Sequence, residues 1–324
     1  MRWKTTLVLL LATLGLGTYV SLVELRQPTR EARERQPLQV LSVSPEAVNR
    51  IAFASPNAGP VTLRRAGSGW VLDPEGYRAD PDLAERLLRD ASHVTASRIL
   101  SASGDAPLDP SAYGLQPPAA TLTLTTDRES AEVRFGETTA VGATRYLMVP
   151  GRDAIFVVPA ALFDQLNQPR GHFRDPLLMR LEFLPEQFLL RTPSTALTIS
   201  RRGIDWVMTQ PVADAVDATE INRAFRRVET LQIQRVVDDA PAVEQRAAWG
   251  LDPPGLELSF FPPENLPPVS LFFGALLPDA PHLRYAKRSD DPSLYAVNAA
   301  EADALLLTPD QLRPAAEPSA NAPE

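Results

Sequence analysis

The chain carries one series of short motifs twice, in the same order, which constrains its fold more than any other feature. Gly69-Trp70-Val71-Leu72 returns as Asp205-Trp206-Val207-Met208, 136 positions further on. Four later motifs repeat with spacings that drift only from 136 to 139. They are Tyr113-Gly114-Leu115-Gln116-Pro117-Pro118 with Trp249-Gly250-Leu251-Asp252-Pro253-Pro254, Phe135-Gly136 with Phe273-Gly274, Arg145-Tyr146 with Arg284-Tyr285, and Ile155-Phe156-Val157-Val158 with Leu294-Tyr295-Ala296-Val297. The body of the chain is therefore predicted to be two copies of one module.

Each copy reads as an α+β module, a mainly antiparallel sheet with covering helices. Apolar residues alternate with polar ones along Thr121-Leu122-Thr123-Leu124-Thr125, as they do in half-buried strands. Asp80 with Pro81 begins one expected helix, and Asp217 with Glu220 three residues later begins its counterpart with a capping-box pattern. We expect the first module at residues 45–168 and the second at residues 169–308.

The amino-terminal segment predicts a membrane anchor. Thr5 to Val23 contains no charged residue, and a helix of this length covers about 28 Å, close to the hydrocarbon thickness of a bilayer. Arg2 and Lys4 precede it, which places the amino terminus in the cytoplasm and the body outside. A cleaved secretory signal, with cleavage near Gly17, is the alternative. We expect a transmembrane anchor at residues 1–26, a flexible linker at 27–44 and a disordered tail at 309–324.

Composition excludes several kinds of protein. The 324 residues include 32 basic and 40 acidic side chains, a net charge of −8, which disfavours nucleic-acid binding. There is no cysteine, so disulfides, thiolate nucleophiles and cysteine-ligated metals are absent from the chain.

Candidate functional residues are few. Arg145-Tyr146 and Arg284-Tyr285 are the binding candidates, because alternation along a strand exposes one residue of each pair and an exposed arginine holds anionic groups. A cross-strand salt bridge is the structural alternative. Trp70 and Trp206 lie beside apolar residues and are expected in the cores.

No catalytic or metal-binding constellation is indicated, and no cofactor is expected. His93, His172 and His282 are far apart in the chain and lie outside any zinc-protease pattern. The acid pairs Asp238-Asp239 and Asp290-Asp291 read as solvated loop residues, since adjacent residues of an extended chain point in opposite directions.

Together, the anchor, the paired Trp motif, the Tyr/Trp-Gly-Leu-x-Pro-Pro box, the Phe-Gly turn with its downstream Arg-Tyr, and Arg174-Asp175-Pro176-Leu177-Leu178 resemble the bacterial family of domain of unknown function DUF4340. The resemblance runs from the anchor to about Leu307. It implies an envelope protein with one membrane anchor, often encoded beside ABC-type transport components related to those of gliding motility. It implies no catalytic residues.

We therefore expect a non-catalytic, single-pass protein of the bacterial inner membrane with its body in the periplasm, acting as a scaffold or binding protein. The resemblance points to ABC-type transporter components as its partners. What recurs in the two copies is Trp, Gly, Pro, Phe and Tyr rather than reactive side chains, which argues against an enzyme. The alternatives are a periplasmic carboxylate-dependent hydrolase and an exported protein that binds a small ligand or glycan.

Overall fold

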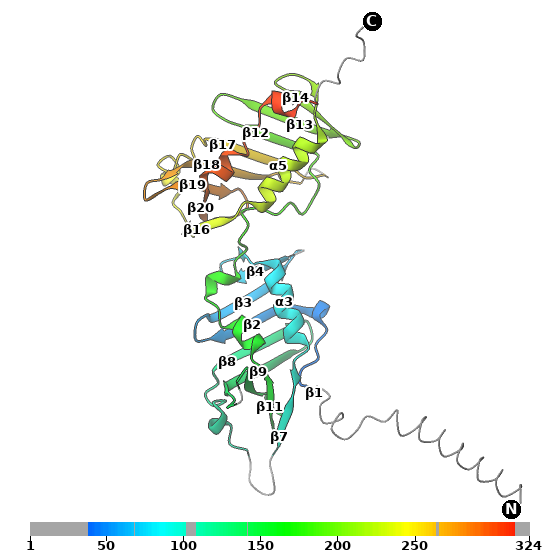
Figure 1. Cartoon of the computed structure of the whole chain (residues 1–324), viewed down its shortest axis with the longest axis vertical. Helices are drawn as coiled ribbons and strands as arrows, with labels where there is room; N and C mark the ends of the chain where they lie inside the picture. The colour runs from blue at the N-terminus through cyan, green and yellow to red at the C-terminus, as the bar shows by residue number, and fades with distance from the viewer. Residues whose placement is uncertain (1–37, 68, 102–107, 141, 264–265, 315–324) are drawn as a thin grey trace, which may run out of the picture. The chain divides into compact units, whose positions relative to one another are not determined.

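Two nine-stranded antiparallel sheets, one in each half of the chain, dominate the fold (Figure 1). The computed structural model describes residues 38–67, 69–101, 108–140, 142–263 and 266–314. The chain divides into two compact units, one ending at Arg174 and the other beginning at Asp175. Each unit is rich in sheet and has few helices, so the expectation of two tandem modules is confirmed.

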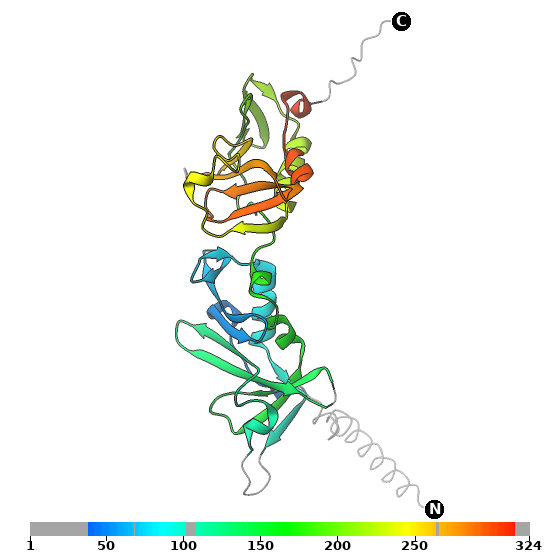
Figure 2. The ribbon, with the colours of Figure 1, turned by 90° about the vertical axis from the view of Figure 1, so that its left-hand side faces the viewer.

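The first unit orders its large sheet β5-β4-β3-β2-β8-β9-β10-β11-β7. Helices α3 (Pro81–Ser92) and α4 (Ala161–Leu166) pack against this sheet (Figure 2). The strands are β2 (Val48–Ser55), β3 (Gly59–Ala66), β4 (Gly69–Asp73), β5 (Tyr77–Arg78), β7 (Arg98–Ser101), β8 (Ala120–Thr126), β9 (Ser130–Thr138), β10 (Thr144–Met148) and β11 (Ala154–Pro159). Short 3₁₀ turns lie at Pro45–Ala47, Pro110–Tyr113 and Arg170–Phe173.

The second unit repeats this topology, with its sheet ordered β15-β14-β13-β12-β17-β18-β19-β20-β16. Helices α5 (Ala218–Thr230) and α6 (Ala299–Asp303) take the places of α3 and α4, and α7 (Pro309–Leu312) follows. The strands are β12 (Gln187–Arg191), β13 (Ala196–Arg202), β14 (Asp205–Gln210), β15 (Asp214–Ala215), β16 (Ile233–Asp238), β17 (Leu256–Phe261), β18 (Val269–Leu277), β19 (Ala280–Arg288) and β20 (Leu294–Asn298). A 3₁₀ turn lies at Val243–Gln245.

The two cores form where the period-two pattern predicts. In β8, Leu122 and Leu124 are buried and lie opposite Phe53 and Ile51 of β2. In β17, Leu258 lies opposite Leu190 of β12 in the same way. Since side chains alternate between the faces of a strand, this register turns one apolar row of each sheet toward its helices.

The two tryptophans are core residues, as expected. Trp70 in β4 is 3% exposed and its indole Nε1 donates to Glu85 Oε1 of α3 at 2.8 Å. Trp206 in β14 is 6% exposed and packs edge-on to Phe225 of α5, with ring centroids 5.5 Å apart. Each tryptophan therefore joins the outer strands of its sheet to the long helix of its unit.

The helix starts are partly as predicted. Asp80 caps α3 by accepting from the backbone N–H groups of Asp82 and Leu83 at 2.9 and 3.2 Å. Asp217 caps α5 by accepting from the N–H of Thr219 at 2.7 Å. The expected capping box is not formed in α5, because the carboxylate of Glu220 accepts from Arg223 one turn further on.

The module boundaries differ from those expected. The segment after Gln168 packs on the first unit, because Phe173 is buried there against Phe53, with ring centroids 4.9 Å apart. The second unit begins at Asp175, whose buried carboxylate accepts from the N–H of Leu177 and from Nε of Arg180. The division therefore lies at Arg174–Asp175 rather than after Gln168.

The flexible linker expected at 27–44 is wrong for its described part. Strand β1 (Leu38–Gln39) pairs with β6 (Thr95–Ala96). Val40 and Leu41 then enter the core of the first unit. Burial of these two apolar side chains lowers the free energy of the folded unit, so the segment packs on the unit instead of remaining a flexible linker.

The disordered tail expected at 309–324 is wrong for residues 309–314. Thr308 and Gln311 form a capping box that begins α7, and Leu312 is fully buried in the second core. Arg313 pairs with Asp214 of β15 at 2.7 Å. A cap and one buried leucine hold this segment, although Pro and Ala dominate the sequence that follows it.

The anchor expected at 1–26 lies outside the described residues. Among the residues that are described, no helix is long and apolar enough to cross a membrane.

Candidate functional site

The candidate residues of the first unit lie around a close contact between a turn and a strand. Arg145 of β10 donates from Nη1 to the carbonyl oxygen of Gly136 in β9 at 2.5 Å. Its guanidinium also stacks over the ring of Phe163 in α4, 3.5 Å from the centroid. Burial lowers the pKa of Arg145, and the charge of Asp164 partly offsets this effect. Arg145 therefore ties β9 to α4.

The second unit repeats this arrangement. Arg284 of β19 donates from Nη1 to the carbonyl oxygen of Gly274 in β18 at 2.8 Å. Its Nη2 forms a salt bridge with Asp303 of α6, also at 2.8 Å. A salt bridge was the structural alternative in the sequence analysis, but we expected it across strands. It runs from strand to helix instead, because α6 lies against β19.

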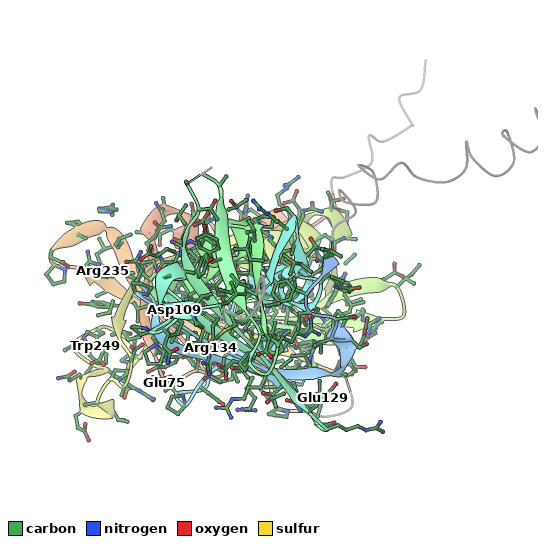
Figure 3. The ribbon with its side chains drawn as sticks, turned by 90° about the horizontal axis from the view of Figure 1, so that it is seen from below. Glu75, Asp109, Glu129, Arg134, Arg235 and Trp249 are labelled. Atoms are coloured by element: carbon green, nitrogen blue, oxygen red, sulfur yellow. The ribbon has the colours of Figure 1, made fainter. Side chains whose placement is uncertain are left out.

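The two tyrosines join the repeated box to this contact. Tyr146 packs edge-on to Tyr113, with ring centroids 4.8 Å apart. Tyr285 packs at a tilt on Trp249, with ring centroids 6.3 Å apart. The side chain of Trp249 is labelled in Figure 3. The sequence does not indicate that the box and the Arg-Tyr pair meet. Tyr113 and Tyr146 are 33 positions apart and Trp249 and Tyr285 are 36 apart, and only the pairing of the strands brings them together.

Glycines permit the close approach. Gly114 and Gly250 adopt left-handed backbone conformations, with φ of +64° and +65°. A Cβ atom at Gly136 would lie 2.3 Å from the carbonyl oxygen of Tyr113, and one at Gly274 would lie 2.1 Å from that of Trp249. Only glycine fits where the turn rests on the strand. We name these two sets the aromatic–arginine clusters: Tyr113, Gly114, Gly136, Arg145 and Tyr146 in the first unit, and Trp249, Gly250, Gly274, Arg284 and Tyr285 in the second.

The chemistry of both clusters is that of internal packing. In each, the arginine directs one of its donors to a backbone carbonyl and its charge toward the following helix. The aromatic rings pack against each other, edge-on in the first unit and tilted in the second. These contacts hold a long connection against the middle of the sheet, so the candidates Arg145, Tyr146, Arg284 and Tyr285 are brought together as structural residues.

The three histidines lie apart. His93 is the exposed C-cap residue of α3, with Nδ1 3.4 Å from the carbonyl oxygen of Arg89. His172 packs edge-on to Phe173, and His282 is exposed on β19. Across the described ranges, no three or more metal-ligating side chains gather in one place.

A polar network in the second unit went unrecognised in the sequence. Asp291, expected to be solvated, is buried, because its carboxylate accepts from the N–H of Ser293 and the hydroxyl of Tyr295 at 2.8 and 2.7 Å. Lys287 donates from Nζ to the carbonyl oxygens of Asp291 and Pro292, both at 2.8 Å. Burial and the nearby charge of Arg246 lower the pKa of Lys287. The network closes the β19–β20 turn.

The sequence also did not reveal a pocket of about 310 Å³ in the first unit, between the end of α3 and α4. Its floor comes from residues that the periodicity assigns to the core, and its rim from exposed residues of α3. The pocket forms only when two helices pack on the sheet, and no local sequence pattern predicts that packing.

The geometry defines a class: a tandem protein of two α+β repeats, each built on a nine-stranded antiparallel sheet and fixed by one aromatic–arginine cluster. The profile of the domain of unknown function DUF4340 matches the chain at residues 70–188 and 206–316. The chain therefore belongs to the DUF4340 family, and the two matched segments begin at the equivalent residues Trp70 and Trp206. No curated protein and no solved structure matches the chain.

Proposed function

We propose that this protein is a non-catalytic, membrane-anchored scaffold whose two units bind other proteins outside the cytoplasm, as an accessory of an ABC-type transport assembly. The observation that carries the proposal is that the repeated residues make contacts inside their own units. Both aromatic–arginine clusters direct their distinctive side chains into contacts within their own unit. Duplication has thus preserved a fold rather than a reacting centre.

The sheets end in strands that suit protein partners. β7 and β16 close the strand orders of the first and second sheets, so each presents backbone N–H and C=O groups on its outer side. β16 is exposed along most of its length, and Val236 and Val237 are apolar residues on it. An added strand from a partner would pair with this backbone and cover these valines.

The membrane part of the proposal rests on the sequence. The uncharged segment from Thr5 to Val23, preceded by Arg2 and Lys4, supports an uncleaved anchor in the bacterial inner membrane with the body in the periplasm. The transporter partner is supported by what the family resemblance implies.

The test is affinity purification of the full-length protein from detergent-solubilised membranes of its native host. Transporter subunits are expected to co-purify, and the protein is expected to resist alkaline extraction. Val237→Glu on β16 should reduce co-purification, whereas the matched control Val243→Glu, exposed but outside the strand, should not. A solitary protein, or a mature amino terminus beginning after Gly17, would contradict the proposal.

A further inference from the structure

The pocket of the first unit has an apolar floor. Its volume of about 310 Å³ falls at the small end of the range of ligand pockets, about 300 to 1,000 Å³. Val94 follows α3, Phe135 comes from β9, Val158 from β11 and Leu162 from α4. These four buried residues belong to the core of the unit, so the floor is held in place by the packing of the fold.

The rim carries charges of both signs. Arg89, Asp90 and His93 lie on the last turn of α3 and its C-cap, and Gln165 lies across from them on α4. Gln165 Nε2 donates to Oδ2 of Asp90 at 2.8 Å, which fixes that carboxylate at the rim. Arg89 forms no ion pair with any residue that the structure describes.

These charges select the ligand. A simple anion would meet Arg89 but also Asp90 and the negative end of the α3 dipole. A simple cation would meet Asp90 but also Arg89. A molecule that carries both charges on neighbouring atoms satisfies both sides, with its carboxylate at Arg89 and its ammonium at Asp90 and the helix end.

We propose that this pocket binds a free apolar α-amino acid, with the side chain on the floor of Phe135, Val158 and Leu162 and the zwitterionic head at Arg89 and Asp90. The proposal is independent of any protein partner. It assigns the recognition site to the first unit, because Asp90 is not repeated at the equivalent position of the second unit.

The charged residues of the rim differ between the two units. Counted from the helix caps Asp80 and Asp217, the position of Arg89 is taken by Arg226 and that of Asp90 by Arg227. Arg227 Nη1 donates to the carbonyl oxygen of Ala304 at 2.9 Å, which ties α5 directly to the chain after α6. These two positions of the second unit therefore carry two arginines and no acid, so they do not present paired opposite charges.

The test is isothermal titration calorimetry of the full-length protein with L-leucine and L-phenylalanine. N-acetyl-L-leucine keeps only the carboxylate and L-leucinamide keeps only the ammonium, so both should bind at least tenfold more weakly. Binding of either derivative as tight as that of leucine would overturn the zwitterion assignment. No heat with either amino acid would overturn the proposal itself.

Variants locate the site. Arg89→Gln and Asp90→Asn should each weaken binding at least tenfold, which corresponds to about 1.4 kcal/mol. The matched control Arg226→Gln in the second unit should bind as the unchanged protein does. Leu162→Trp should fill the floor and abolish binding, and an unchanged melting profile of Arg89→Gln and Asp90→Asn would show that they fold. Equal loss in Arg226→Gln, or none in Arg89→Gln and Asp90→Asn, would exclude this pocket.

Discussion

Replacing Gly274 by alanine tests whether the aromatic–arginine cluster holds the second unit together. The added Cβ would lie 2.1 Å from the carbonyl oxygen of Trp249 and 3.2 Å from backbone atoms of Gly250. Backbone atoms cannot rotate away as a flexible side chain can. The turn from Trp249 to Leu251 must therefore lift off β18.

The cost follows from the contacts that the lifted turn gives up. The N–H of Ala275 donates to the carbonyl oxygen of Trp249 at 2.8 Å, and such a bond contributes about 1 kcal/mol. The turn also gives up the packing of Trp249 on Tyr285, and an aromatic pair of this kind contributes about 0.5 to 1.5 kcal/mol. We expect a loss of about 1.5 to 2.5 kcal/mol in the free energy of unfolding of this unit. At about 2 to 4 °C per kcal/mol, its melting temperature should fall by about 3 to 10 °C.

The assay is differential scanning calorimetry of the full-length protein, with Gly255→Ala as the matched control. Gly255 lies in the same connection, but a Cβ there would be 3.4 Å from the carbonyl oxygen of Phe273, an ordinary contact. Gly136→Ala should produce the equivalent loss in the first unit. If Gly274→Ala melts like Gly255→Ala, the close approach is not a structural requirement and the reasoning fails.

Trp70→Ala and Trp206→Ala should each lower the free energy of unfolding by about 3 to 5 kcal/mol, because each removes a buried ring that joins the sheet to the long helix of its unit. Thermal unfolding should show this loss chiefly in the unit that carries the change. A retained melting profile would instead make the rings surface platforms. The hydrogen bond from Arg313 lowers the pKa of Asp214, so the contact between α7 and β15 should persist above the ordinary carboxyl range and be lost as the pH falls through the lowered value. NMR titration of the Asp214 carboxyl group should show this depression, and Arg313→Gln should return the pKa toward its usual value; an equally low pKa in that variant would refute the assignment.

The repeat made most of the fold predictable. Paired motifs indicated two equivalent modules before any strand was assigned, and alternation along Thr121–Thr125 placed Leu122 and Leu124 inward, as they are. The predictions for the segments at the two ends of the described chain were wrong. The segments that contain Val40 and Leu312 are rich in polar residues or proline. Val40 and Leu41 in the first segment and Leu312 in the second are nevertheless buried in cores built from distant strands.

The candidate site was predictable as a set of residues but not as an arrangement. Arg145 and Arg284 were recognised because they recur, yet their partners Gly136 and Gly274 were recognised only as parts of a separate motif. A bulge in the register between β18 and β19 determines which carbonyl meets Arg284. Such offsets depend on strand pairing, which sequence spacing does not fix.

The positions at which the two repeats differ indicate where their functions diverge. Lys287, Asp291 and Tyr295 of the polar network correspond to Met148, Arg152 and Phe156 in the first unit. There Arg152 donates to the carbonyl oxygen of Val40 at 2.9 Å and so secures the strand that enters from the amino-terminal side.

The two units also differ where α3 meets α4 and where α5 meets α6. The first unit has a pocket whose rim carries Arg89 and Asp90, whereas the equivalent positions of the second unit carry Arg226 and Arg227, and Arg227 binds the carbonyl oxygen of Ala304. Residues that both copies share, such as the glycines and arginines of the clusters, are required by the fold that both copies have. A role specific to one unit must therefore reside in residues that are not shared, and in the first unit the rim residue Asp90, replaced by an arginine in the second, is such a residue.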